Sequence, residues 1–198
     1  MIITNQTTPD ANQSWVLPAR GPVGMLALIV AESAIFFIFV VAYIYNIGRS
    51  ISGPTPKEVL DVPIFITICL LSSSLTIWLA ERAVARDRRG MFTFWWLTTF
   101  LLGSIFLGGT AREWHTLIYR DNFTISTNLF GTTFYSLVGL HATHVLVGLV
   151  GILIVLVFAL FRKVDSAHAY RLNVFGLYWH FVDTVWVVVF TVVYLVGR

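Results

Sequence analysis

Five ionisable residues lie inside stretches of the sequence that are otherwise apolar. Glu32 lies within AESAIFFIF, His141 and His144 form HATH, and His180 and Asp183 belong to YWHFVD. Residues three apart lie on neighbouring positions of one helix face. A charged carboxylate within a bilayer costs on the order of 3 kcal/mol, so Glu32 must be protonated, paired or beside water. These residue types suit proton relay, and we predict a buried polar cluster of Glu32, His144, His180 and Asp183.

The same residue types also fit a structural role or a metal or haem site. Glu32 can be a neutral group that only packs between helices, or it can contact a lipid headgroup or a partner helix. A b-type haem would need facing histidines on two helices, which only His141 or His144 with His180 can supply. Zinc and copper sites normally use three or four ligands. Because HATH supplies two, we predict no metal bound by this chain. The sequence also has no phosphate-binding loop, nucleophile elbow or HExxH motif, so we predict no cofactor and no catalytic residue.

Charged and aromatic residues close to the expected helix ends have a simpler interpretation. Glu81 and Glu113 each stand beside an arginine and are predicted to mark the membrane boundary. His115 has tryptophan and tyrosine neighbours and is predicted to be an interfacial anchor. His141 and Glu113 are kept as secondary candidates for the polar site.

The composition is that of a membrane protein. Of the 198 residues, 57% are hydrophobic and 12% are charged, and the mean hydropathy is +0.80. Soluble domains carry about 25% charged residues, so a soluble enzyme is excluded. The net charge of +3 comes from clustered arginines without interleaved aromatics, which gives no support for nucleic-acid binding. The single cysteine, Cys69, excludes a disulfide within the chain.

Five stretches reach the length of about 20 apolar residues that a membrane-spanning helix needs. We therefore predict an all-α polytopic membrane protein with a five-helix bundle. The predicted spans are residues 23–47, 62–81, 91–111, 129–161 and 175–197. Residues 1–22 are a polar segment without the features of a signal peptide, and residues 23–198 form one transmembrane domain.

The distribution of lysine and arginine predicts the orientation. With five spans, eight of these residues fall on the side of the N-terminus: Arg20, Arg82, Arg86, Arg88, Arg89, Arg162, Lys163 and Arg171. Five fall on the other side: Arg49, Lys57, Arg112, Arg120 and Arg198. We therefore predict a cytoplasmic N-terminus and an external C-terminus.

Two long motifs resemble a known family. Residues 130–151 read FGTTFYSLVGLHATHVLVGLVG and residues 178–194 read YWHFVDTVWVVVFTVVY. Both resemble signatures of subunit III of the haem-copper respiratory oxidases, and Glu32 in ESAIFF is similar to that family's SE--FF. The resemblance covers about residues 20–197 and matches the bacterial five-helix form, without the first two helices of the seven-helix form. Ala142 stands where the family usually has glycine.

The resemblance implies a function in aerobic electron transport. Subunit III carries no haem or copper, which this family holds in subunits I and II. It packs on subunit I, stabilises the oxygen-reducing site, supports proton uptake and binds phospholipid. The expected complex is a proton-pumping cytochrome c oxidase in the bacterial plasma membrane. The alternatives are a quinol oxidase, the accessory membrane protein of nitric oxide reductase, a free-standing b-type haem protein and a small carrier.

Overall fold

The described part of the chain is helical. The computed structural model describes residues 20–47 and 62–196, and these residues form no β-strand. The long helices are α1 (Arg20–Asn46), α3 (Ile64–Ala85), α4 (Arg89–Tyr119), α5 (Leu129–Leu160) and α6 (Ala169–Phe190). The 3-10 helix η1 (Ser166–His168) precedes α6, and the π-helix η2 (Thr191–Val196) continues it. Five helical stretches are long and apolar enough to cross a membrane, which confirms the predicted all-α fold class and its five spans.

α4 and α6 extend furthest beyond the spans that apolarity predicted. α4 continues from residue 111 to Tyr119, and α6 begins at Ala169 rather than near residue 175. The added turns contain arginines and other polar residues, which end an apolar window without ending a helix. Hydropathy therefore located the membrane-crossing part of each helix and missed the turns beyond it. The predicted polar segment before α1 lies mostly outside the described residues, as does most of the loop after α1.

Turns with left-handed backbone end three of the helices. Asp87, Asn122 and Arg162 have φ angles of 51°, 50° and 57°, and each lies within three residues of a helix end. α5 then begins at a capping residue, because the Asn128 side chain accepts a hydrogen bond from the backbone N–H of Gly131. Short polar turns of this kind make consecutive helices antiparallel.

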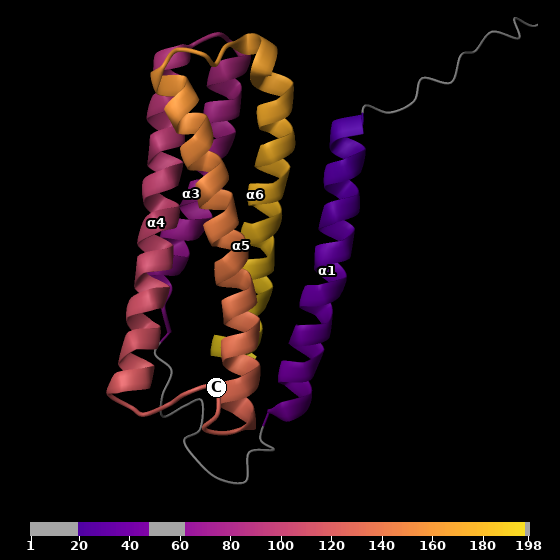
Figure 1. Ribbon diagram of the computed structural model, residues 1–198, viewed down its shortest axis with the longest axis vertical. Helices are drawn as coiled ribbons and strands as arrows, with labels where there is room; N and C mark the ends of the chain where they lie inside the picture. The colour runs from indigo at the N-terminus through magenta and orange to yellow at the C-terminus, as the bar shows by residue number, and fades with distance from the viewer. Residues whose placement is uncertain (1–19, 48–61, 197–198) are drawn as a thin grey trace, which may run out of the picture.

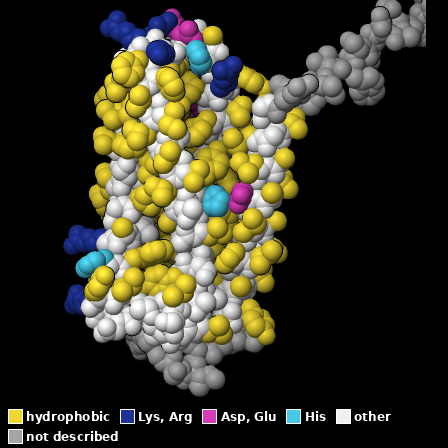
Figure 2. Space-filling view, viewed as in Figure 1, with side chains coloured by type: hydrophobic (Ala, Val, Ile, Leu, Met, Phe, Trp, Pro, Cys, Tyr) yellow, Lys and Arg dark blue, Asp and Glu magenta, His cyan; other side chains and the backbone are white. Residues whose placement is uncertain are grey.

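Figure 1 shows α3, α4, α5 and α6 as a bundle, with α1 lying along one side of it. α1 packs against α5 and α6. Among its described residues, the buried hydrophobic side chains are Phe36 and Tyr43. α1 begins at the end of the bundle where α3 ends. Figure 2 shows basic side chains gathered at the two ends and a largely apolar surface between them. This arrangement fits a bundle surrounded by lipid.

Trp179 is the residue on which the bundle converges. It lies on α6, is fully buried, and donates from Nε1 to the Ser73 hydroxyl of α3 at 2.8 Å. A Cβ added to Gly103 of α4 would lie 3.0 Å from its ring, and one added to Gly148 of α5 would lie 2.7 Å from it. The two glycines therefore make room for the indole, and α3, α4 and α5 all contact this one side chain of α6.

Candidate functional site

Glu32 and His144 form a polar pair between α1 and α5. His144 Nε2 lies 3.1 Å from Glu32 Oε2, and the imidazole and carboxyl side chains are 14% and 24% exposed. His144 Nδ1 lies 2.8 Å from the carbonyl oxygen of Leu140 and must donate to it. The Nε2–Oε2 bond then needs one proton, held either by the imidazole or by the carboxyl group. The pair is therefore a site at which a single proton can be shared.

A small cavity surrounds this pair. It has a volume of about 230 Å³ and is lined by Leu28, Glu32, Thr143, His144, Val147 and Tyr178. The Tyr178 hydroxyl donates to the backbone carbonyl of His144 at 3.0 Å. α6 thus contributes to a site whose titratable groups come from α1 and α5.

His180 and Asp183 form a second polar group, which faces α3. Ser74 Oγ lies 3.1 Å from His180 Nδ1 and donates a hydrogen bond to Asp183 Oδ2. Asp183 is 3% exposed, and its other oxygen, Oδ1, is buried and has no hydrogen-bond partner within the described residues. Ser74 therefore joins His180 and Asp183 in one hydrogen-bonded group. The sequence did not predict this, because a serine among other serines carries no signal of its own.

The four residues predicted as one cluster thus bond in two groups. Glu32 and His144 meet between α1 and α5, whereas His180 and Asp183 meet at Ser74 of α3. The spacing of His180 and Asp183 placed them on one face of their helix. The spacing does not indicate how α6 is rotated about its own axis, and this rotation turns the face toward α3.

His141, a secondary candidate, lies in an aromatic environment. It is 1% exposed, and its ring stacks on Trp186 with centroids 4.9 Å apart. The edge of Phe106 lies 5.8 Å away. Neither ring nitrogen has a hydrogen-bond partner among the residues the structure describes. His141 therefore belongs to the packed core, whereas His144, one turn further along α5, faces α1.

Glu113, the other secondary candidate, connects α4 to the end of α6. Its carboxylate accepts from the Tyr194 hydroxyl at 3.0 and 3.2 Å. Tyr194 is buried and lies in the π-helical turn η2. The sequence predicted Glu113 as a boundary charge and did not predict this hydrogen bond.

Glu81 also has a more specific place than a boundary charge. Its carboxyl group packs directly against the backbone of Gly176 on α6, in the space that a Cβ would fill. It lines a cavity of about 280 Å³ together with His180. The other lining residues come from the beginnings of α1 and α6: Pro22, Tyr170, Asn173, Val174 and Leu177.

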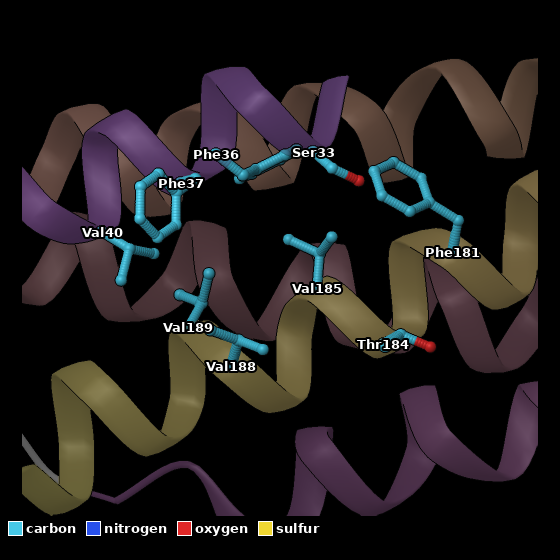
Figure 3. Close-up of a pocket in the computed structure, with 9 residues that line it drawn as sticks. All are labelled: Ser33, Phe36, Phe37, Val40, Phe181, Thr184, Val185, Val188 and Val189. Carbon is cyan, nitrogen blue, oxygen red and sulfur yellow. The ribbon is translucent and has the colours of Figure 1, made fainter. Parts of the chain in front are cut away.

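An apolar groove lies between α1 and α6, and Phe36 forms part of its wall. Figure 3 shows side chains of the two helices facing each other across it, with the hydroxyls of Ser33 and Thr184 toward one end. The groove has a volume of about 270 Å³ and is otherwise lined by phenylalanine and valine. Its chemistry matches a hydrocarbon chain.

The arrangement of these groups defines the chemistry they can perform. Within residues 20–47 and 62–196, no three histidine, cysteine, aspartate or glutamate side chains come together as a metal site would require. The two polar groups instead place an imidazole within hydrogen-bond reach of a carboxyl group, directly or through a hydroxyl. They can hold and pass protons.

Comparison with known proteins identifies relatives along nearly the whole chain. The family model described as cytochrome c oxidase subunit III matches residues 17–198. Cytochrome c oxidase subunit 3 of Alkalihalophilus pseudofirmus is 39% identical over 84% of this chain and 82% of its own length. The cytochrome bo(3) ubiquinol oxidase subunit 3 of Pseudomonas aeruginosa is 33% identical over 88% and 84%. Cytochrome c oxidase subunit 3 of Bacillus subtilis is 33% identical over 98% and 95%.

Proposed function

Because the chain belongs to the cytochrome c oxidase subunit III family, we propose that it is the non-redox subunit III of a proton-pumping oxidase that uses cytochrome c. The family match over residues 17–198 carries this proposal. The chain is part of an oxidoreductase complex, and the oxygen chemistry is assigned to partner subunits.

The choice of electron donor is supported by two observations. The relative named a cytochrome c oxidase subunit reaches 39% identity, compared with 33% for the relative named a ubiquinol oxidase subunit. Glu32 stands at a position where we expect aspartate in the quinol type. A quinol oxidase is the second candidate, because relatives named as quinol oxidase subunits match at 30% and 33% identity.

We assign the partners by the same family membership. Haem and copper are expected in subunits I and II, and this chain packs its helices directly on subunit I, where it stabilises the oxygen-reducing site and supports proton uptake. Phospholipid is expected to occupy the apolar groove of Figure 3 with an acyl chain, between α1 and α6. The Glu32–His144 pair faces a different cavity, beside α5, and can meet a polar lipid group there.

The proposed location is the plasma membrane of a bacterium, with the N-terminus in the cytoplasm. The chain is a multi-pass membrane protein by its five spans. The excess of arginines at the end where α3 passes into α4 supports the orientation.

Purification of the tagged chain from native membranes tests the function. We expect a large haem protein and a copper-binding protein to copurify, and no haem to remain with this chain after dissociation. Oxygen consumption by the complex should be faster with reduced cytochrome c than with a quinol. Faster consumption with the quinol would favour the second candidate, and a chain that purifies alone with its own haem would contradict both.

A further inference from the structure

A continuous file of polar groups runs from one end of the bundle into its interior between α3 and α6. It begins at the cavity lined by Glu81 and His180, where the first half of α6 meets the last turns of α3. It continues from His180 Nδ1 to Ser74 Oγ at 3.1 Å and from Ser74 to Asp183. The file ends at Asp183 Oδ1, which is buried without a partner in the described chain.

Asp183 lies in surroundings that favour an uncharged carboxyl group. It is 3% exposed, and the three ion pairs within residues 20–47 and 62–196 do not include it. Burial of a carboxylate without a countercharge is expensive, and such a group usually neutralises by binding a proton. A proton is also a ligand that needs no cavity of its own.

We propose that Asp183 is a proton-binding site inside the bundle and that it exchanges its proton with water at the α3–α4 end through Ser74 and His180. The file can be written with two sets of hydrogen bonds. In the first, His180 Nδ1–H donates to Ser74 Oγ, and Ser74 donates to the ionised Asp183. In the second, protonated Asp183 donates to Ser74, Ser74 donates to Nδ1, and the ring carries its proton on Nε2.

These two arrangements differ by one proton. A proton that binds Nε2 of His180 from the cavity allows the Nδ1 proton to move to Ser74, while the Ser74 proton moves to Asp183 Oδ2. No oxidant or other reactant is needed, and the reverse steps release the proton. Nε2 has no hydrogen-bond partner among the described residues, which leaves it for the water of the cavity.

The cavity at the start of the file is suited to supply protons. The half-buried carboxyl group of Glu81 lies against Gly176, one helical turn before His180 on α6. Other helices packed on α6 bring their own titratable groups. His141 of α5 stacks on Trp186, and Glu32 of α1 is engaged by His144 of α5, so neither belongs to this file.

Infrared spectroscopy of the purified oxidase complex tests the proposal. The carbonyl stretch of a protonated carboxyl group is compared in wild type, Asp183→Asn and Glu32→Gln, and its shift is then timed after transfer into heavy water. We expect a band that Asp183→Asn removes and Glu32→Gln retains. In Ser74→Ala its exchange should slow about tenfold or more, because proton transfer needs a partner within hydrogen-bond reach.

Ser136→Ala is the matched control, because the Ser136 hydroxyl donates to the Thr132 carbonyl within α5 and its loss should leave the exchange rate unchanged. His180→Phe should slow the exchange in the same way, because it removes the ring nitrogen that faces Ser74. If that variant fails to assemble, Ser74→Ala decides the question. A spectrum in which Asp183→Asn removes no band, or exchange that is equally fast in Ser74→Ala, overturns the proposal. The exchange does not depend on the electron donor, so either failure would leave the proposed function intact.

Discussion

The pairing of Glu32 with His144 is a polar bond at a helix contact that is otherwise apolar. Both side chains lie on surfaces that α1 and α5 turn toward each other, and Phe36 packs beside His144 with ring centroids 5.0 Å apart. A histidine that loses its partner in such a place leaves a polar nitrogen unsatisfied. The bond therefore matters for how firmly α1 is held.

Glu32→Leu should weaken the docking of α1. The loss of one partner from a partly buried hydrogen bond costs about 1–3 kcal/mol, whereas Glu32→Gln can still donate to His144 Nε2 and should cost less. The thermal midpoint of the purified complex, followed by tryptophan fluorescence, measures the difference. Ser136→Ala, which removes a hydroxyl that bonds only within α5, should unfold like wild type. Equal midpoints for the leucine and glutamine variants would contradict this account.

Asp165 gives a pH-dependent prediction outside the membrane. A hydrogen bond from His168, 2.7 Å away, and one from the backbone N–H of Ala167 lower the pKa of Asp165 from its ordinary value of 3.8. Because the folded-state pKa is depressed, the stabilising contribution is present above pH 3.8 and is lost as the pH falls through the lower folded value. It is constant near neutral pH.

His168→Ala should raise the pKa of Asp165 back toward 3.8. NMR titration of isotope-labelled aspartate carboxyl groups in the chain measures this change. His115→Ala is the control, because His115 lies against Tyr119 near the end of α4, at the opposite end of the bundle. An Asp165 titration unaffected by His168→Ala would show that the hydrogen bond does not persist in solution.

At the scale of helices, close approach depends on glycines that face Trp179. Gly148→Ala would place a methyl group 2.7 Å from the indole, and overpacking of this kind costs about 1–3 kcal/mol. We expect lower levels of assembled complex and a lower thermal midpoint. Gly108 has open space around its Cα, so Gly108→Ala should be neutral or slightly stabilising. A midpoint lowered equally by both substitutions would contradict this account, because of these two glycines only Gly148 lies against the indole.

The sequence predicted the helices better than their contacts. Uninterrupted apolar stretches identified five spans because a helix in lipid must satisfy its own backbone, and α5 was placed within one residue of its end. Helix rotation was not predictable in the same way. These helices are apolar on every side, so periodicity does not show that Ser74 meets Asp183 or that Glu81 meets Gly176.

Across the whole molecule, the alternation of helix directions places charges unequally at the two ends. The turn from α3 to α4 contains Arg86 and Arg88, α4 begins at Arg89, and α6 begins at the same end. The loop between α4 and α5 lies at the other end with the end of the chain (Figure 1). The proposed entrance to the proton file, at Glu81 and His180, thus lies at the more basic end, which we propose is cytoplasmic.

Labelling of single cysteines tests this orientation directly. Cys69 is buried and is the only cysteine of the chain. Cys69→Ser therefore gives a chain without thiols and replaces one small side chain with another of similar size. Ala85 at the end of α3 and Ser126 between α4 and α5 are both exposed and small. In that background, Ala85→Cys should react with a membrane-impermeant maleimide only in inside-out vesicles.

Ser126→Cys should show the opposite behaviour and react in intact cells. The reason is electrostatic, because short loops rich in lysine and arginine are retained on the cytoplasmic side. Reaction of Ala85→Cys in intact cells would show that all five spans have the opposite orientation. It would then place the cavity of Glu81 and His180 on the outer surface, where protons taken up by Asp183 would come from outside the cell.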